Sequence, residues 1–343
     1  MAYDNDILNI ELLSIGYNPG TRKEKVLLPP LNLSVRKGEM VALLGPNGIG
    51  KSTLLRTIAC LHPGISGEIK LFNKKIEDYL NSELARKISF VFSGSINVYN
   101  MSVYEIVSLG RFPHTNWLGR LTKADRIIVE KAIDAVGMAK YSGSNIGELS
   151  DGERQRAMIA RALAQDTELI LLDEPTAFLD LPNRYELISL LRRLSVESNK
   201  SVIFSSHDIH IAIRETDKVW MATGEGILQG SPEDLALAGT FNDLFPDSDL
   251  SFVSCEGIFT YPVRTRMTLR LEGEGLALYW TERALGRLGI KAHPGEGSPS
   301  VTILSEGGNQ IWIYESSVVS KQFHNIYSLI LYMKEVLKGS YND

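Results

Sequence analysis

The sequence predicts an α/β fold followed by a small α+β domain. Short apolar runs alternate with amphipathic helical patterns as far as Pro232, and a glycine-rich loop connects one of these runs directly to a helix. Near residue 250 this alternation stops, and a β-α-β-β-α pattern begins. We therefore expect a first domain over residues 5–250 and a second over residues 251–343.

The first domain is expected to contain buried parallel strands with helices between them, because its strands read as near-continuous apolar runs. The expected strands are residues 7–13, 31–35, 39–44, 168–172 and 201–205. The expected helices are residues 51–60, 122–136, 152–165 and 182–198. In the second of these helices, Thr122 is a suitable N-cap and Gly137 a suitable end. Its apolar side is expected to consist of Ile127, Ile128, Ala132 and Val136.

The second domain contains no motif that indicates chemistry. Its expected elements are a strand at 265–272, a helix at 276–289, strands at 300–304 and 309–314 that meet at Gly307-Gly308, and a helix at 318–338. Trp280, Trp312 and Tyr314 are expected to be core or interface aromatics. We expect this domain to pair subunits or to regulate them.

Composition narrows the possible functions. The chain has 343 residues, 44% of them hydrophobic, and a formal charge of −5, so we expect a globular protein and no nucleic-acid partner. No stretch approaches the roughly 20 apolar residues that span a bilayer, and the N-terminus lacks a secretory pattern. Any action on a membrane would therefore require a partner. Cys60 and Cys255 have no paired spacing, and we expect ordinary buried or half-buried thiols.

The glycine-rich loop fits the Walker A pattern. Its glycines let successive backbone N–H groups turn toward a phosphate, and the helix that follows directs its positive end at the same anion. Lys51 would reach the β- and γ-phosphates, and Ser52 would coordinate Mg²⁺. The residues expected to contact ATP are Gly45, Pro46, Asn47, Gly48, Ile49, Gly50, Lys51, Ser52 and Thr53.

A second motif, of the Walker B type, ends an apolar strand with two acids. Asp173 would hold Mg²⁺, and Glu174 would polarise the water that attacks the γ-phosphate. The presence of Walker A upstream makes a chance pair of acids a poor explanation.

The segment 149–156, Leu-Ser-Asp-Gly-Glu-Arg-Gln-Arg, is similar to the signature motif of ABC transporter nucleotide-binding domains. This resemblance covers about residues 5–250. It implies a P-loop ATPase with a RecA-like core, an antiparallel β subdomain and a helical subdomain. It also implies a head-to-tail homodimer with two ATP molecules between the subunits. The residues that would contact the nucleotide of the other subunit are Ser150, Asp151, Gly152 and Glu153.

Three further positions match this family. Asp180 ends a segment similar to the D-loop, which crosses between the two sites. His207 matches the switch histidine that senses the γ-phosphate, so the resemblance assigns it a catalytic role with Glu174. Tyr17 lies where the family has an aromatic residue that stacks on adenine.

Two positions depart from the family pattern. Ser93 stands where the Q-loop normally has glutamine, and its shorter side chain leaves direct contact with Mg²⁺ and coupling to the partner in question. Asp151 replaces a usual glycine in the signature motif, and we expect its carboxylate to point away from the γ-phosphate. Ile49 replaces a smaller residue at a position that contributes its backbone.

The segment 108–114 is similar to one in ATPases of iron-siderophore, haem and cobalamin importers. The resemblance implies that this region, with residues 101–107, docks a membrane permease. A periplasmic or surface binding protein would then act indirectly, and the chain would be peripheral on the cytoplasmic face of the cell membrane. The alternatives left open are another cargo, an exporter and a soluble ABC protein without a transport role.

Overall fold

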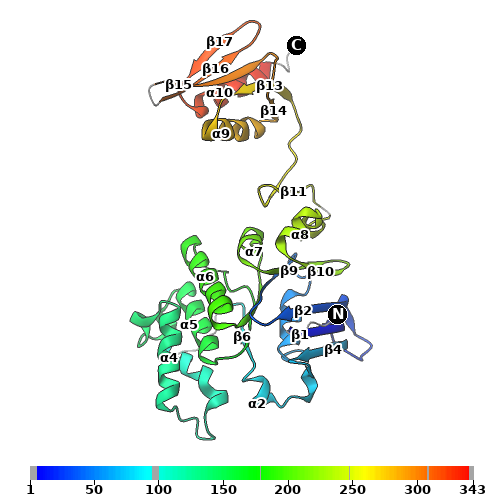
Figure 1. Ribbon diagram of the computed structural model, residues 1–343, viewed down its shortest axis with the longest axis vertical. Helices are drawn as coiled ribbons and strands as arrows, with labels where there is room; N and C mark the ends of the chain where they lie inside the picture. Colours follow the sequence, from blue (N-terminus) through cyan, green and yellow to red (C-terminus); the bar gives the residue numbers. More distant parts are fainter. Residues whose placement is uncertain (1–5, 95–99, 178, 247, 307–308, 340–343) are drawn as a thin grey trace. The chain divides into compact units, whose positions relative to one another are not determined.

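The chain divides into two units between Phe259 and Thr260 (Figure 1). The structure is a computed structural model, and it describes residues 6–94, 100–177, 179–246, 248–306 and 309–339. The division falls after the expected boundary at residue 250, because a short hairpin packs on the first unit. In this hairpin, formed by β11 (Ser251–Val253) and β12 (Ile258–Thr260), the ring of Phe252 lies 4.7 Å from that of Phe241.

The first unit is built on a six-stranded sheet in the order β10-β9-β3-β8-β7-β6. Its strands are β3 (Met40–Leu44), β6 (Ile88–Val91), β7 (Leu169–Leu172), β8 (Ser201–Ser205), β9 (Lys218–Thr223) and β10 (Gly226–Gly230). Only the β9–β10 pair is antiparallel. Since successive side chains of a strand point to opposite faces, Val41 and Leu43 enter one hydrophobic core, whereas Ala42 and Leu44 enter another.

Each face of this sheet is covered by a different layer. The first core joins the sheet to α1 (Lys51–Ile58) and to an antiparallel sheet made of β1 (Asp6–Tyr17), β2 (Lys25–Arg36), β4 (Ser66–Leu71) and β5 (Lys74–Lys75). The second core contains residues of α3 (Val103–Ser108), α4 (Lys123–Ala135), α5 (Asp151–Ala164), α6 (Leu181–Ser198) and α7 (Ile209–Glu215). Two short helices, α2 (Asn81–Leu84) and α8 (Pro232–Leu237), complete the unit. This arrangement agrees with the predicted α/β class.

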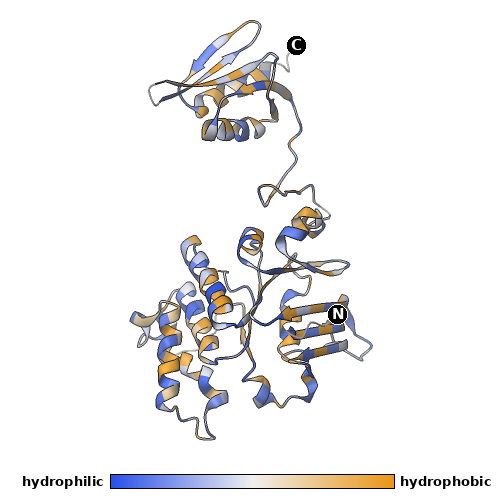
Figure 2. Ribbon diagram, in the orientation of Figure 1, coloured by the Kyte–Doolittle hydropathy of each residue, from blue (hydrophilic) through white to orange (hydrophobic). Residues whose placement is uncertain are grey.

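Helix α4 begins as predicted, and its buried side includes Ala132 and Val136 of the predicted apolar side but not Ile127. The hydroxyl of Thr122 accepts a hydrogen bond from the backbone N–H of Asp125, so the predicted N-cap is confirmed. The prediction for Ile127 was wrong, because its side chain is 52% exposed. Hydrophobic and hydrophilic residues alternate along this helix in Figure 2. Its buried apolar residues, with the C-cap, are Val129, Ala132, Ile133 and Val136.

The second unit is a five-stranded sheet with two helices. The strands are β13 (Met267–Glu272), β14 (Ile290–His293), β15 (Ser300–Glu306), β16 (Asn309–Glu315) and β17 (Ser320–Phe323), in the order β14-β13-β15-β16-β17. Helices α9 (Gly275–Gly286) and α10 (Ile326–Gly339) share its core. In that core the indole N–H of Trp312 donates to the hydroxyl of Thr281 over 2.8 Å.

One expectation for the second unit needs correction, and one strand was missed. The single helix expected at 318–338 is instead β17 followed by α10, because residues 320–323 pair with β16. Of the three aromatic residues expected in the core or at an interface, Trp312 and Tyr314 are buried and Trp280 is exposed. Strand β14 was not predicted. The expected turn at Gly307-Gly308 lies outside the described residues.

None of the helices in the described ranges is both long and apolar enough to cross a bilayer.

Candidate active site

The phosphate loop connects the carboxyl end of β3 to the start of α1. Gly45 needs to be glycine, because its φ is +151° and an added Cβ would lie 2.7 Å from the carbonyl oxygen of Ala222. Gly50 precedes the first turn of α1, which has no side-chain cap and no acidic residue. The first backbone N–H groups of this helix therefore remain available to an anion.

The side chain of Lys51 folds back over the loop. Its ammonium group donates to the carbonyl oxygens of Gly45, over 2.7 Å, and Pro46, over 3.0 Å. Burial lowers the pKa of Lys51, while the charges of Glu174 and Asp173 act in the opposite direction. The loop thus holds one cation where its backbone turns.

Three hydroxyl groups converge on the buried carboxylate of Asp173. Ser52 donates to Oδ1 over 2.9 Å, Ser205 donates to the same oxygen over 2.9 Å, and Ser93 donates to Oδ2 over 3.1 Å. The three come from α1 and from the ends of β8 and β6, which neighbour β3 or β7 in the sheet. The carboxyl ends of parallel strands thus assemble this group at one edge.

These oxygen atoms fit a magnesium ion bound with a nucleotide. Mg²⁺ prefers oxygen ligands and is usually held by one or two protein groups together with substrate phosphates. Ser52 and Asp173 offer such groups beside the phosphate loop. Ser93 also reaches this cluster, although its hydroxyl already donates to Asp173. Serine at the Q-loop position therefore lies close enough to take part.

Glu174 and His207 are adjacent. The imidazole Nε2 of His207 lies 2.7 Å from the Oε1 atom of Glu174, and both side chains are partly exposed. The backbone of Glu174 has φ +48°, an uncommon conformation for a residue other than glycine, and its N–H donates to the hydroxyl of Ser205 over 2.8 Å. A carboxylate whose backbone is fixed by Ser205 and whose side chain contacts His207 is suited to orienting a water molecule.

Tyr17 lies beside the start of α1. Its hydroxyl is 3.4 Å from the hydroxyl of Thr53, and its ring meets the ring of His62 edge-on at 5.7 Å. Tyr17 is 44% exposed, so part of the ring is accessible to a base. His62 was not predicted at this site.

The signature segment caps helix α5 and does not hydrogen-bond to the phosphate loop in the described chain. The hydroxyl of Ser150 accepts from the N–H of Glu153 over 3.4 Å, and Glu153 accepts from the N–H of Ser150 over 2.9 Å. Hydrogen bonds from Tyr141 and Ser150 lower the pKa of Glu153. Asp151 forms an ion pair with Arg154. Gly152 follows in the first turn of α5.

Asp180 likewise caps a helix, because its carboxylate accepts from the N–H of Asn183 at the start of α6 over 3.1 Å. Phe178, in the same expected D-loop, lies outside the described residues.

Two residues near Asp173 were missed by the sequence analysis. Ser205 is identifiable in retrospect, because β8 is parallel to β7 and Phe204 is opposite Leu172, which puts the next residue opposite Asp173. Arg56 extends from α1 to within 3.9 Å of the same carboxylate. No local motif marks either residue.

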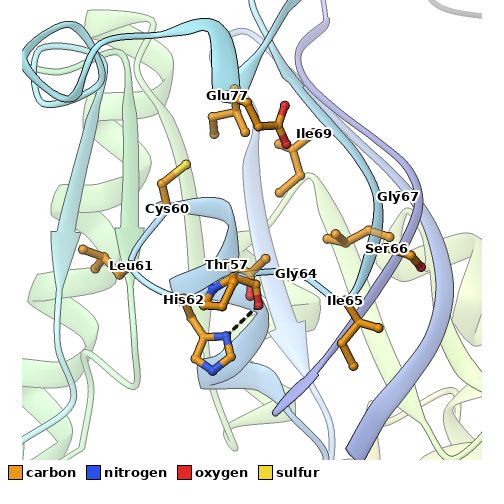
Figure 3. A pocket seen from close by; sticks show the side chains of 13 residues that line it. Thr57, Cys60, Leu61, His62, Gly64, Ile65, Ser66, Gly67, Ile69 and Glu77 are labelled. Atoms are coloured by element: carbon orange, nitrogen blue, oxygen red, sulfur yellow. Dashed lines mark hydrogen bonds between the residues drawn. The ribbon is translucent and has the colours of Figure 1, made fainter. Parts of the chain in front are cut away.

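A cavity of about 510 Å³ lies at the far end of α1 (Figure 3). Its lining includes Thr57, Cys60, His62 and Glu77, and none of the phosphate-loop residues. Cys255 is exposed, so the expectation of a buried or half-buried thiol was wrong for it, whereas Cys60 lies at the surface with its thiol partly buried in the cavity lining. Partial burial and the charge of Glu77 raise the pKa of the Cys60 thiol. This cavity adjoins the residue that contacts Tyr17.

The segment expected to dock a permease is anchored by its polar residues. Arg111 is buried, and it pairs with Asp125 over 2.9 Å and donates to the carbonyl oxygen of Ala164 over 2.8 Å. His114 lies 2.9 Å from the carbonyl oxygen of Gln165. These side chains hold the segment against α4 and α5 and are not free for a partner.

Apolar residues of the same region are exposed instead. Phe112 is 72% exposed and Trp117 is 91% exposed, with Leu109 and Leu118 half exposed. Three apolar residues of α3, within the segment 101–107 that is expected to form part of the docking surface, face inward. The inward residues are Val103, Ile106 and Val107.

Comparison with known proteins gives two family matches. A family described as ABC transporter matches residues 28–177, and one described as iron ABC transporter C-terminal domain matches residues 266–334. An uncharacterized ABC transporter ATP-binding protein of Methanocaldococcus jannaschii is 36% identical over 78% of this chain and 92% of its own length. The iron(3+)-hydroxamate import ATP-binding protein of Bacillus subtilis is 40% identical over 60% of this chain and 75% of its own length. A solved dimeric bacterial ABC transporter cassette is similar with a TM-score of 0.58 and 28% identity, covering 66% of this chain and 98% of that one.

Proposed function

Because the chain belongs to the family of ABC transporter ATP-binding proteins, we propose that it hydrolyses ATP to drive import of an iron chelate through a separate membrane permease. The observation that carries the proposal is the group around Asp173. It brings hydroxyls from Ser52, Ser93 and Ser205 together beside the phosphate loop, with Glu174 as the next residue.

The phosphate loop would bind the triphosphate of ATP. The N–H groups between Gly45 and Thr53 provide donors, and Lys51 would exchange its two carbonyl partners for β- and γ-phosphate oxygens. Ser52 and Asp173 would hold Mg²⁺, with Ser93 at the same cluster. When bound, this ion neutralises charge on the phosphate oxygens. Tyr17 would stack on the adenine.

Glu174 would act on the attacking water. Its carboxylate would accept a hydrogen bond from the water and take up a proton as the water oxygen bonds to the γ-phosphorus and the bond from that phosphorus to the leaving ADP oxygen breaks. His207 holds this carboxylate from the side at 2.7 Å and would donate to the γ-phosphate once ATP is present. The pair would thus couple orientation of the water to the presence of the third phosphate.

Hydrolysis would require two copies of the chain. Ser150 is exposed at the start of α5, and we expect it and the first turn of this helix to contact the γ-phosphate in the other copy, with the Ser150 hydroxyl exchanging Glu153 for a phosphate oxygen. Asp151, already paired with Arg154, would keep its charge away from that phosphate. Asp180 would lie between the two sites.

The permease would bind at the exposed apolar residues near Phe112 and Trp117. A tryptophan that is 91% exposed places a large apolar surface in water when the chain is alone, and tryptophan is a common anchor in protein interfaces. The buried pair of Arg111 and Asp125 would keep this segment rigid. The chain would then lie peripherally on the cytoplasmic face of the membrane.

The cargo class is supported by similarity. The import protein of Bacillus subtilis is named for iron(3+)-hydroxamate, and the match over residues 266–334 is to a domain of iron ABC transporters. A ferric chelate is therefore favoured over haem or cobalamin.

A transport experiment tests the proposal. The full chain would be co-purified with membrane proteins, reconstituted with its permease and a binding protein, and assayed for ATP-dependent uptake of radioactive iron as hydroxamate or catecholate chelates. We expect uptake that Glu174→Gln abolishes. The proposed function would be contradicted if no permease co-purified with the chain, or if only cargo without iron stimulated ATPase activity.

A further inference from the structure

The second unit contains a cavity of about 320 Å³ with a strongly basic lining. Its cationic side chains are Arg266, Arg287, Lys334 and Lys338. The floor is apolar and includes Leu288 and the buried Leu337. This size lies at the lower end of the range for small-molecule pockets.

Three separate elements bring these cations together. Arg266 precedes β13, Arg287 is the C-cap residue of α9, and the two lysines are four residues apart on α10, which puts them on one side of the helix. The cluster is therefore a product of the fold and is not a run of charges in the sequence.

The position of Arg266 is set by the backbone. Its N–H donates to the carbonyl oxygen of Gly289 over 2.7 Å. Gly289 has φ +77°, and an added Cβ would lie 2.5 Å from the carbonyl oxygen of Arg264 and 3.1 Å from Cγ of Arg266. The absence of a side chain at residue 289 lets the stem of Arg266 lie against the chain.

No acidic side chain in the described ranges forms an ion pair with any of the four cations. Elsewhere in the same unit, Arg270 pairs with Glu272, and Lys321 lies over the ring of Tyr332. Like charges four residues apart on a helix repel each other, so the repulsion between Lys334 and Lys338 slightly destabilises the chain without a bound anion. A bound anion would relieve this repulsion.

We propose that this cavity binds a small organic anion with at least two negative charges, a phosphate ester or a polycarboxylate. Guanidinium groups bind such oxyanions through two parallel hydrogen bonds, and ammonium groups add charge without a fixed direction. The floor of Leu288 and Leu337 selects an anion with an apolar part over an inorganic ion.

Calorimetric titration of the full chain tests this binding. Saturating ADP would fill the phosphate loop, and the probes would be phenyl phosphate, inorganic phosphate and citrate. We expect phenyl phosphate to bind more tightly than inorganic phosphate, and citrate to report whether carboxylates suffice. Arg287→Glu and Lys334→Glu should each weaken binding about tenfold or more, because each removes a charge-assisted contact and adds repulsion.

The matched control is Lys291→Glu, which makes the same charge change at an exposed lysine outside the cavity. Its affinity should equal that of the unaltered chain. Equal losses in all three variants, or no binding of any probe, would overturn the proposal. A second outcome would also overturn it: the chain sediments with phosphatidylglycerol vesicles, Arg287→Glu abolishes this, and no small anion binds. That outcome would assign the cluster to a lipid surface. ATP hydrolysis by the first unit is not required for any of these outcomes.

Discussion

The imidazole of His207 lies 2.7 Å from the carboxylate of Glu174, although 33 positions separate them in the chain. Strands β7 and β8 run parallel and adjacent, so the residues that follow their ends emerge at the same edge. The pairing of these two strands therefore brings the two side chains together.

We predict that Glu174→Gln lowers the rate of ATP hydrolysis by a factor on the order of 10²–10⁴, because glutamine cannot take a proton from water. ATP should remain bound and hold two copies together, which size-exclusion chromatography with light scattering would detect. Glu168→Gln, at a half-exposed acid just before β7, should leave both properties unchanged. Normal turnover in Glu174→Gln would exclude this residue as the base.

Lys51→Ala should weaken ATP binding by about tenfold to a hundredfold, as expected for the loss of charge-assisted hydrogen bonds to phosphates. A fluorescent ATP analogue would measure the affinity. The exposed Lys123 on α4 provides the control, since Lys123→Ala removes the same charge far from the loop in sequence. If the two variants bound ATP equally well, the phosphate assignment would fail.

Loss of the Ser93 hydroxyl should have a smaller effect than loss of the Ser205 hydroxyl. Ser93 makes one hydrogen bond to Asp173, whereas Ser205 donates to Asp173 and also accepts from the N–H of Glu174. We expect Ser93→Ala to raise the Mg²⁺ concentration for half-maximal ATPase activity, and Ser205→Ala to raise it further and lower the maximal rate. Titration of Mg²⁺ against both variants gives the order, and a reversed order would contradict the geometry.

Trp117→Ala should reduce co-purification with the permease while ATP hydrolysis by the isolated chain is unchanged. A central aromatic anchor typically contributes about 2 kcal/mol or more to an interface. Ile127→Ala is the control, because Ile127 is another exposed apolar residue, on α4. If both variants recovered equal amounts of permease, Trp117 would not be part of the docking surface.

The Arg111–Asp125 pair predicts a pH dependence of stability. Hydrogen bonds from Thr122, and then the bond and charge of Arg111, lower the pKa of Asp125 to about 2 from an ordinary 3.8. The folded state thus favours the ionised carboxylate. Its contribution to the unfolding free energy is complete above about pH 4 and is lost as the pH falls through about 2.

In Asp125→Asn this acid-dependent loss should be absent, and the neutral-pH unfolding free energy should be lower because Arg111 loses its buried partner. Urea unfolding between about pH 5 and pH 2 measures both effects relative to the unaltered chain. Asp134→Asn, at an exposed position on the same helix, is the matched control. Parallel pH profiles for all three proteins would refute the prediction.

The sequence was informative where function depends on short local patterns. The phosphate loop, the acids after β7 and the cap at Thr122 each lie within a few consecutive residues, and their backbone conformations follow from glycine, strand end and capping chemistry. The α/β class follows from the alternation of strands and helices. These features need no knowledge of distant contacts.

Errors arose where distant contacts decide. Residues 320–323 are polar and continue into a helical pattern, and only pairing with β16 makes them a strand. Asn325 could have located the true helix start, because its side chain accepts from the N–H of Ser328 over 2.8 Å. The burial of Arg111 depends likewise on Asp125 and on a carbonyl of α5.

The short side chain of Ser93 limits how far its loop can travel. Its hydroxyl is attached by a single rotatable bond and lies 3.1 Å from Asp173, so a shift of about half an ångström already exceeds hydrogen-bonding distance. A longer amide would follow such a movement by rotating. Serine cannot follow such a movement, so a small displacement of the loop by a partner would make or break the hydrogen bond to Asp173 beside the nucleotide.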